Sequence, residues 1–169
     1  MSLNKTRVAI DVACTESIAL DLVEASVPLA VTHALTLTDG TGAGQADLIF
    51  HDRRTLAASA NEDIDLNGVL TKLGQTVNFA RIRAVVVLAS SENTNDVQVT
   101  RPSANGVPLF MAAGDGIALR PGEAFAWLGG AADATGKVVT AGTADLLNVA
   151  NSGAGSSVTY DVIIIGCSA

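Results

Sequence analysis

Apolar and polar residues alternate with a period of two along most of this chain. In Thr32–Thr38, which reads THALTLT, Leu35 and Leu37 are separated by threonine. Successive side chains of a β-strand point to opposite faces, so this alternation is typical of a strand with one buried face. The same pattern predicts strands at 7–13, 18–23, 32–38, 46–51, 62–66, 77–88, 97–99, 107–111, 117–119, 124–128, 137–140, 143–149 and 158–165.

Clusters of Gly, Asn, Asp and Ser separate these segments, and no amphipathic helix pattern of ten or more residues stands out. Short strands joined by turns predict an all-β fold, here a single-domain antiparallel β-sandwich. Val162–Ile165 reads VIII and is apolar on both faces, which predicts a central strand covered on both sides. We expect residues 1–30 to form an amino-terminal segment, either an arm or edge strands, and residues 31–169 to form the sandwich body.

The composition is that of a globular domain with more apolar surface than one small core needs. Of 169 residues, 49% are hydrophobic and 16% are charged, and the mean hydropathy is +0.39. The longest apolar run, Ala84–Ala89, has strand length and falls far short of the roughly 20 residues of a membrane-spanning helix. Asp11 interrupts the apolar stretch near the amino terminus, so no secretory signal and no membrane partner are expected.

Charge and cysteine content narrow the possible partners further. The net charge is −7 and aromatic residues make up 4% of the chain. Binding to phosphates relies on clustered Lys and Arg, and binding to single strands relies on aromatic stacking, so no nucleic-acid partner is expected. Cys14 and Cys167 belong to no CxxC motif. We expect two free thiols in a reducing compartment, with a bridge between the chain ends as the alternative.

One segment, DIDLNG at 63–68, resembles the start of a calcium-binding EF-hand loop. Oxygen ligands occupy the first, third and fifth positions of such a loop, Gly the sixth, and a bidentate Glu the twelfth. The matching residues are Asp63, Asp65, Asn67 and Gly68. The twelfth position, however, is Gly74, and Ile64 and Leu66 between the ligands give the alternation of a half-buried strand. We therefore predict a strand that ends in an Asn-Gly turn, and no metal site.

The other candidates for chemistry are weak. His51 and Asp52 are adjacent, and adjacent side chains on a strand point to opposite faces, so we expect a polar strand end rather than a catalytic pair. His33 shares a face with Leu35 and is expected at the edge of the core. The loops at 40–44 and 114–116 lack the spacing of a phosphate-binding loop. We predict no catalytic residue and no cofactor; an enzyme would need His51 to converge with Asp52 or Asp63.

The segment 77–88 predicts a long central strand with two different faces. We expect one face in the core, namely Ala80, Ile82, Ala84, Val86 and Leu88, with Arg81 and Arg83 on the opposite face at an outer or subunit surface. Trp127 follows the turn at Pro121-Gly122 and is expected to be a core aromatic. The alternative for Trp127 is a platform for a ligand.

Five segments, in this order and spacing, resemble small virion proteins of tailed bacteriophages. They are ADLIFHDRRTLAASANEDIDLNG (46–68), NFARIRAVVV (78–87), ENTNDVQV (92–99), ALRPGEAFAW (118–127) and VTAGTADLLNVANSGAGSSVTYDVIIIG (139–166). They are strand-and-turn signatures, and residues 1–45 match less clearly.

The resemblance implies a jelly-roll-like sandwich and a non-enzymatic structural role. The implied function is a head decoration, or cement, protein that is made in the host cytoplasm and braces capsomers on the outer capsid surface. Its partners would be the major capsid protein and further copies of itself, with a trimer favoured. Two alternatives stay open. One is a tail, neck or baseplate component, and the other is a carbohydrate-binding module for host adsorption, in which Trp127 or Tyr160 would line a groove.

Overall fold

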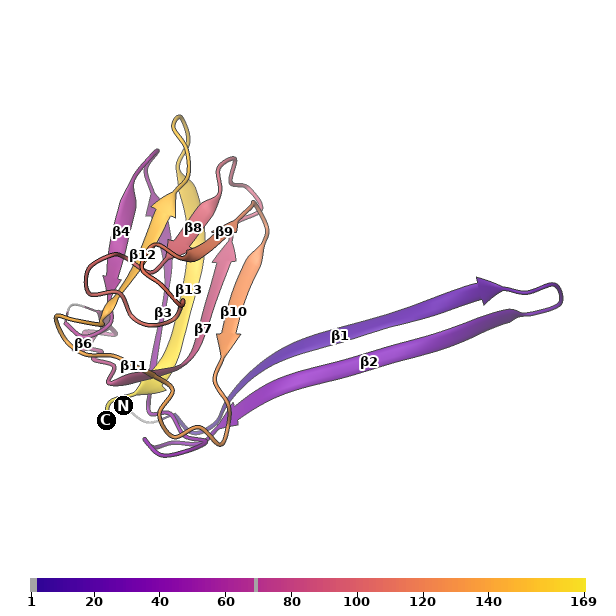
Figure 1. Cartoon of the computed structure of the whole chain (residues 1–169), viewed down its shortest axis with the longest axis horizontal. Coiled ribbons are helices and arrows are strands. Elements are labelled where there is room, and N and C mark those ends of the chain that lie inside the picture. The colour runs from indigo at the N-terminus through magenta and orange to yellow at the C-terminus, as the bar shows by residue number, and fades with distance from the viewer. Residues whose placement is uncertain (1–2, 69) are drawn as a thin grey trace.

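The computed structural model describes residues 3–68 and 70–169 as a β-sandwich with a long two-stranded arm (Figure 1). This part of the chain contains no helix, and hence none long and apolar enough to cross a membrane. Strand β1 (Thr6–Ala19) and strand β2 (Glu24–Leu37) form the arm, and the strands that follow form the body.

The body consists of two antiparallel sheets. The first sheet has the order β10 (Ala124–Leu128), β7 (Arg81–Ala89), β13 (Val158–Cys167), β3 (Leu48–Leu56), and β11 (Lys137–Val138) adds to β7. The second has the order β4 (Asn61–Asp65), β12 (Leu146–Asn151), β8 (Val97–Thr100), β9 (Gly116–Leu119). A small hairpin, β5 (Thr71–Lys72) with β6 (Gln75–Thr76), is separate. Apart from the short β11, each sheet has four strands, and sheets in this order form a jelly roll, so the predicted all-β, single-domain, jelly-roll-like sandwich is confirmed.

The main core lies between the two sheets. Val162 and Ile164 of β13 point into it and are fully buried, whereas Ile163 and Ile165 point to the outer side of the first sheet. On the outer side, Leu35 and Leu37 at the base of the arm pack on Ile165 and bury it. The predicted central strand is therefore confirmed at β13, which pairs with β7 on one side and β3 on the other, while its outer face is buried at Ile165 and half-buried at Ile163.

The faces predicted for β7 are wrong beyond Ile82. Ile82 lies in the core as expected, but Val85 and Val87 are the next core residues, while Leu88 is on the outer side and 39% exposed. A β-bulge causes the reversal. Gly166 pairs with Ile82 and Ile165 with Ala84, so an extra residue of β7 lies between the two pairs and shifts the alternation by one.

Arg83 is that extra residue, and it is buried rather than at a surface, contrary to the sequence prediction. It is 1% exposed, and its guanidinium donates to the main-chain oxygens of Gly42 (2.9 Å), Ala134 (2.9 Å) and Asp133. Arg81, by contrast, is half-buried and donates to the Ala134 oxygen at 2.7 Å. Arg83 thus ties the loop at the base of the arm to the loop that follows β10.

The segment 107–111, which the sequence predicts to be a strand, is an irregular loop in the structure. Val107 and Leu109 are nevertheless buried in the main core. Arg101 donates to the main-chain oxygens of Phe110 (3.2 Å) and Met111 (2.9 Å), which satisfies acceptors that a paired strand would otherwise satisfy. The alternation here reflects burial of side chains, not pairing of the backbone.

The arm is a regular hairpin throughout its length. Its register runs without interruption from the pair Thr6 and Leu37 to the pair Ala19 and Glu24, and the turn closes with a hydrogen bond from the Leu20 N–H to the Val23 oxygen (2.9 Å). The arm leaves one end of the body and projects away from it (Figure 1). It extends to Leu37, so residues 31–37, which we assigned to the body from the sequence, belong to the arm.

Candidate assembly interface

The two faces of the arm differ in chemistry. Directly paired residues of an antiparallel hairpin lie on the same face, so the register assigns each residue to one of them. The apolar face is formed by Val8, Ile10, Val12, Cys14, Ile18, Ala25, Val27, Leu29, Val31, Leu35 and Leu37, with Thr6, Glu16 and His33 among them. On the polar face, alanines alternate with charged residues and hydroxyls, and the Thr32 hydroxyl donates to Asp11 (2.7 Å).

Most of the apolar face is open to solvent. Val12, Val31 and Leu29 are 52%, 54% and 50% exposed. An isolated two-stranded hairpin is marginally stable in water, because neither face is covered and the backbone order has to be maintained by the pairing alone. A contiguous apolar surface of this kind is typical of a site that is covered in an assembly.

The base of the same face is already covered by the body. Leu35 and Leu37 are 2% and 1% exposed and belong to a cluster with Ala84 and Ile165 on the outer side of the first sheet. Val8, partly buried, packs against this cluster as well. The apolar face is therefore one continuous surface that begins inside the molecule and extends beyond it.

A second surface, partly apolar and partly charged, lies farther along the outer side of the first sheet. We call it the outer patch and define it as His51, Arg53, Leu88, Asp161 and Ile163. These residues border an open depression of about 410 Å³. Leu88 is 39% exposed and Ile163 is half-buried. The outer patch thus combines apolar side chains with a few charged ones.

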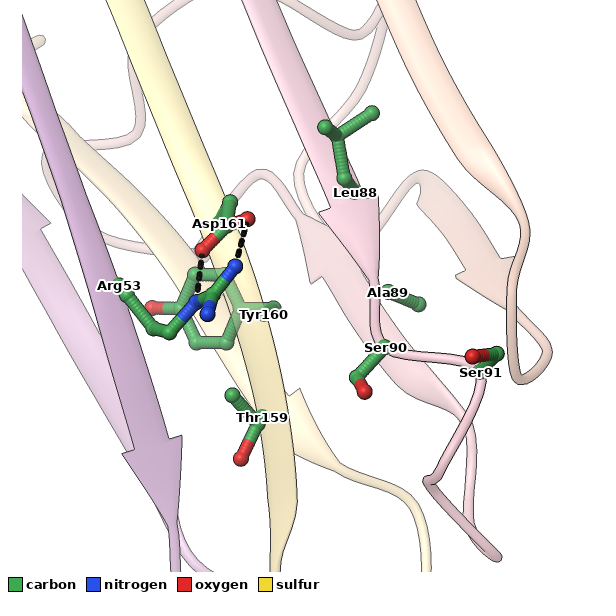
Figure 2. A pocket seen from close by; sticks show the side chains of 8 residues that line it. All are labelled: Arg53, Leu88, Ala89, Ser90, Ser91, Thr159, Tyr160 and Asp161. Carbon is green, nitrogen blue, oxygen red and sulfur yellow. Dashed lines mark hydrogen bonds and ion pairs between the residues drawn. The ribbon is translucent and has the colours of Figure 1, made fainter.

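An ion pair fixes the polar part of the outer patch. The Arg53 guanidinium donates to both carboxylate oxygens of Asp161, at 2.6 Å from Nε and 2.8 Å from Nη2. This contact lowers the pKa of Asp161 and raises that of Arg53. Figure 2 shows the pair on one side of β13, with the Tyr160 ring on the other side, and a neighbouring depression of about 240 Å³ extends from the pair toward Ser90 and Ser91.

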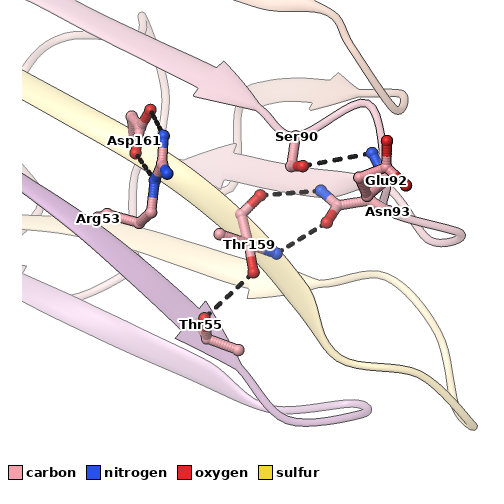
Figure 3. A network of polar contacts seen from close by, with 7 residues as sticks. All are labelled: Arg53, Thr55, Ser90, Glu92, Asn93, Thr159 and Asp161. Carbon is pink, nitrogen blue, oxygen red and sulfur yellow. Dashed lines mark hydrogen bonds and ion pairs between the residues drawn. The ribbon is translucent and has the colours of Figure 1, made fainter.

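A network of hydrogen bonds holds the adjoining end of the sheet (Figure 3). The Asn93 amide donates to the Thr159 main-chain oxygen (2.9 Å), and its oxygen accepts from the Thr159 N–H (2.8 Å). The Thr159 hydroxyl lies 3.1 Å from that of Thr55 on the next strand. Asn93 therefore continues the pairing of β13 where β7 has ended.

The residues considered for catalysis do not converge. His51 and Asp52 lie on opposite faces of β3, as predicted, and Asp52 pairs with Arg54 (3.2 Å). Asp63 lies on the second sheet and accepts from the Asn148 amide (2.8 Å). His33 is exposed on the arm, two residues before the buried Leu35 and on the same face of the hairpin.

The candidate calcium loop is a strand and a turn, as predicted. Ile64 and Leu66 are buried, while Asp63 is exposed and Asp65 half-buried. The Asp65 carboxylate accepts from the Asn67 N–H (2.9 Å), which shapes the turn. Within residues 3–68 and 70–169, no three His, Cys, Asp or Glu side chains are grouped as metal ligands would be.

The two aromatic residues considered as ligand platforms face the body. Tyr160 is 1% exposed and its hydroxyl donates to Glu62 (2.7 Å). Trp127 is half-buried against the main core, and the Lys137 ammonium lies 5.6 Å from the centre of a Trp127 ring. A buried Tyr160 has no open face on which a sugar could stack, and the core position predicted for Trp127 agrees with its packing.

Burial makes Tyr160 a direct reporter of folding. Its pKa lies well above the ordinary value, first because burial penalises the phenolate and then because Glu62 accepts its proton in a hydrogen bond. Because the pKa of Tyr160 is higher in the folded than in the unfolded state, the protonated side chain stabilises the fold. This stabilisation is fully present below the unfolded pKa of about 10 and declines as the pH rises above that value.

We therefore expect no tyrosinate absorbance at 295 nm around pH 10 to 11 while the protein is folded, and a rise only when it unfolds. The chain has one tyrosine, so the signal belongs to Tyr160 alone, and Tyr160→Phe is the blank. Ionisation near pH 10 with an unchanged far-ultraviolet circular dichroism spectrum would contradict the buried position.

The two cysteines are free and have different surroundings. Cys14 is exposed on the apolar face of the arm, while Cys167 is buried and its sulfur lies 3.5 Å from the Gln45 main-chain oxygen. The predicted free thiols are confirmed, and the alternative of a bridge is not formed.

Comparisons with protein families, with curated proteins and with solved structures find no match to this chain.

Proposed function

We propose that this protein is a non-enzymatic structural subunit of a tailed-bacteriophage virion, a decoration or cement protein on the outer surface of the head that braces neighbouring capsomers. The observation that carries the proposal is the projecting arm with its exposed apolar face. Contiguous exposed apolar surface marks interaction sites in soluble proteins, which supports a role in an assembly.

The dimensions of the arm support a bracing role. Fourteen residues per strand at about 3.4 Å each give a length of about 48 Å. A body of roughly 130 residues has a radius of gyration of about 14 Å and is roughly 35 Å across. The arm thus reaches past the edge of its own body to a neighbouring subunit, and many identical contacts of this kind add up through avidity on a lattice.

The fold of the body and the net charge of the chain support a role on a virion. Jelly rolls occur in viral capsid proteins, and also in lectins and cupins, so the fold by itself leaves the function open. The resemblance of residues 46–166 to tailed-phage virion proteins favours the first group. A net charge of −7 suits the outside of a particle better than an interior lined by DNA.

The partners follow from this role. The major capsid protein is the surface to which the subunit binds, and copies of this chain, in a trimer at a threefold position, are its neighbours. The protein is made in the host cytoplasm and works on the capsid surface. A place in the tail, neck or baseplate is the second candidate, because the same arm also suits the joining of subunits in a small ring.

The number of copies per particle tests the proposal. Quantitative mass spectrometry of purified virions, measured against the major capsid protein, is expected to give a ratio near one or a simple fraction set by the lattice. A handful of copies per particle would transfer the protein to the tail or neck. Absence from the particle would overturn the virion role altogether.

A further inference from the structure

We infer that the apolar face of the arm binds a second copy of this chain, by packing on the outer patch of that copy's first sheet. The inference goes beyond the proposed function, because it specifies an interface between copies and applies whether or not they sit on a virion. It follows from the reach of the arm, from the contact the arm already makes, and from the matching surface on the body.

The arm cannot cover itself. At about 48 Å it is longer than the body is wide, and it projects away from the sandwich (Figure 1). Its own body covers Leu35 and Leu37 at the base, while Ile10 and Ile18 are 44% and 53% exposed. The partner that covers them is therefore outside this chain.

The base of the arm shows which kind of surface this face fits. There, Leu35 and Leu37 pack on Ala84 and Ile165, which are outward-facing residues of the first sheet. The outer patch continues that same side of the sheet with Ile163, which is half-buried against this cluster, and with Leu88, which is 39% exposed. Within the described residues, every copy thus carries an arm with an exposed apolar face and a sheet surface that is covered only in part.

The polar positions of the two surfaces are also complementary. The apolar face of the arm includes one acidic residue, Glu16, and one histidine, His33. The outer patch includes Arg53, whose side chain is 74% exposed, together with Asp161. Arg53 and Asp161 are paired with each other, and the exposed outer edge of the Arg53 guanidinium is the group on the patch that suits the acidic group of the arm.

The exposed part of the arm offers a modest area per contact. Beyond the covered base, two strands about 4.8 Å apart and about 34 Å long present a face of about 330 Å². With a similar area from the partner, one contact buries about 650 Å², which is a weak interface by itself, and each copy makes two of them, one through its arm and one through its patch. Because the arm and the patch are different surfaces, each copy donates one arm and accepts one, and the contacts form a ring when the rotation between copies closes.

The native thiol provides the first test. Cys14 lies on the apolar face and is exposed, whereas Cys167 is buried. We expect the alkylation rate of Cys14 in the purified protein to fall at least tenfold as the concentration rises from submicromolar to about 100 µM, while sedimentation velocity shows conversion of monomer to a closed oligomer. A monomer at every concentration, with Cys14 equally reactive throughout, would overturn the inference.

Two neighbouring arm residues provide matched variants. Val31 is on the apolar face and Ala30 on the polar face, and both are exposed. Val31→Asp is expected to weaken self-association at least tenfold and Ala30→Asp to leave it within twofold, with the same thermal midpoint for the body in both. Equal assembly of the two variants would overturn the role of the apolar face.

The outer patch has its own matched pair. Leu88 on the patch and Ile117 on the second sheet are both 39% exposed. Leu88→Asp is expected to weaken assembly at least tenfold, and Ile117→Asp to leave it within twofold. If Leu88→Asp assembles normally while Val31→Asp does not, the arm binds elsewhere on the partner, and the patch is excluded as its surface.

Two further outcomes separate this inference from its rivals. Binding of the monomer to liposomes of phosphatidylcholine and phosphatidylglycerol, without self-association, would replace the second copy by a lipid surface and overturn the inference. Assembly of the pure protein, with no copies found in the virion, would support the interface and reject the virion role.

Discussion

Replacing Ile82 with aspartate is expected to leave no cooperatively folded protein. Ile82 is completely buried in the core between the two sheets, at the point where β7 pairs with both β13 and β11. Burying an unpaired carboxylate costs several kcal/mol, and the lost packing of the isoleucine adds about 2 to 5 kcal/mol. Together these costs reach the whole stability of a typical domain, about 5 to 15 kcal/mol. Urea denaturation followed by circular dichroism would show no sigmoidal transition.

Two variants of the same strand show whether the bulge assigns the faces correctly. Val87→Asp is expected to be as damaging as Ile82→Asp, because Val87 is 0% exposed. Leu88→Asp is expected to melt cooperatively and close to the native midpoint, because Leu88 is 39% exposed on the outer side. A folded Val87→Asp protein together with an unfolded Leu88→Asp protein would mean that the alternation continues through Arg83 without a bulge.

Replacing Arg83 with methionine is expected to lower the free energy of unfolding by about 1 to 3 kcal/mol. Its guanidinium donates to three main-chain oxygens, those of Gly42, Asp133 and Ala134, in a site where Arg83 is 1% exposed. Methionine has a similar length but no donor. The Gly42 oxygen keeps the Gln45 N–H and the Ala134 oxygen keeps Arg81, so the Asp133 oxygen is the one that loses its donor, and an unsatisfied buried group costs about 1 to 3 kcal/mol. The loops at 39–46 and 129–136 then lose their shared anchor, which amide hydrogen exchange would detect.

Arg81→Met is the control, because Arg81 is only half-buried and donates to the Ala134 oxygen alone. The change in the free energy of unfolding, measured by urea denaturation, is expected to stay below about 1 kcal/mol. Arg83→Lys is expected to lie between the two, since one ammonium cannot match the planar fork of a guanidinium. An Arg83→Met protein as stable as the native one would show that the desolvation of this charge outweighs its hydrogen bonds.

The sequence was a good guide wherever burial alone decides the structure. Alternation located most of the body strands, and the run at Val162–Ile165 identified the central strand, because a strand covered on both faces has no polar side to present. It failed at Arg83. An arginine in a strand suggests solvent, and the main-chain oxygens that satisfy it come from loops 41 and 50 or more residues away, which a local pattern does not reveal.

The arm illustrates a second limit. Val12 and Val31 give the same alternation as a strand of the sandwich, because the pattern records which face is apolar and not what covers it. In the structure, β1 pairs with β2 along their whole length and with no other strand of the described chain. The exposure of Val12 and Val31 then shows that this face is uncovered. The outer patch escaped prediction for the same reason, since its residues come from β3, β7 and β13.

The position of β13 in the first sheet sets an order in which the protein can fold. β13 is the final strand along the chain, yet it lies between β7 and β3, which come much earlier. During synthesis the first sheet therefore waits for its central strand, whereas the arm needs only a local turn and can form in microseconds. A nascent chain thus exposes its apolar arm together with the edges of β3 and β7 that β13 later pairs. Until β13 leaves the ribosome, these exposed surfaces make the chain prone to aggregation.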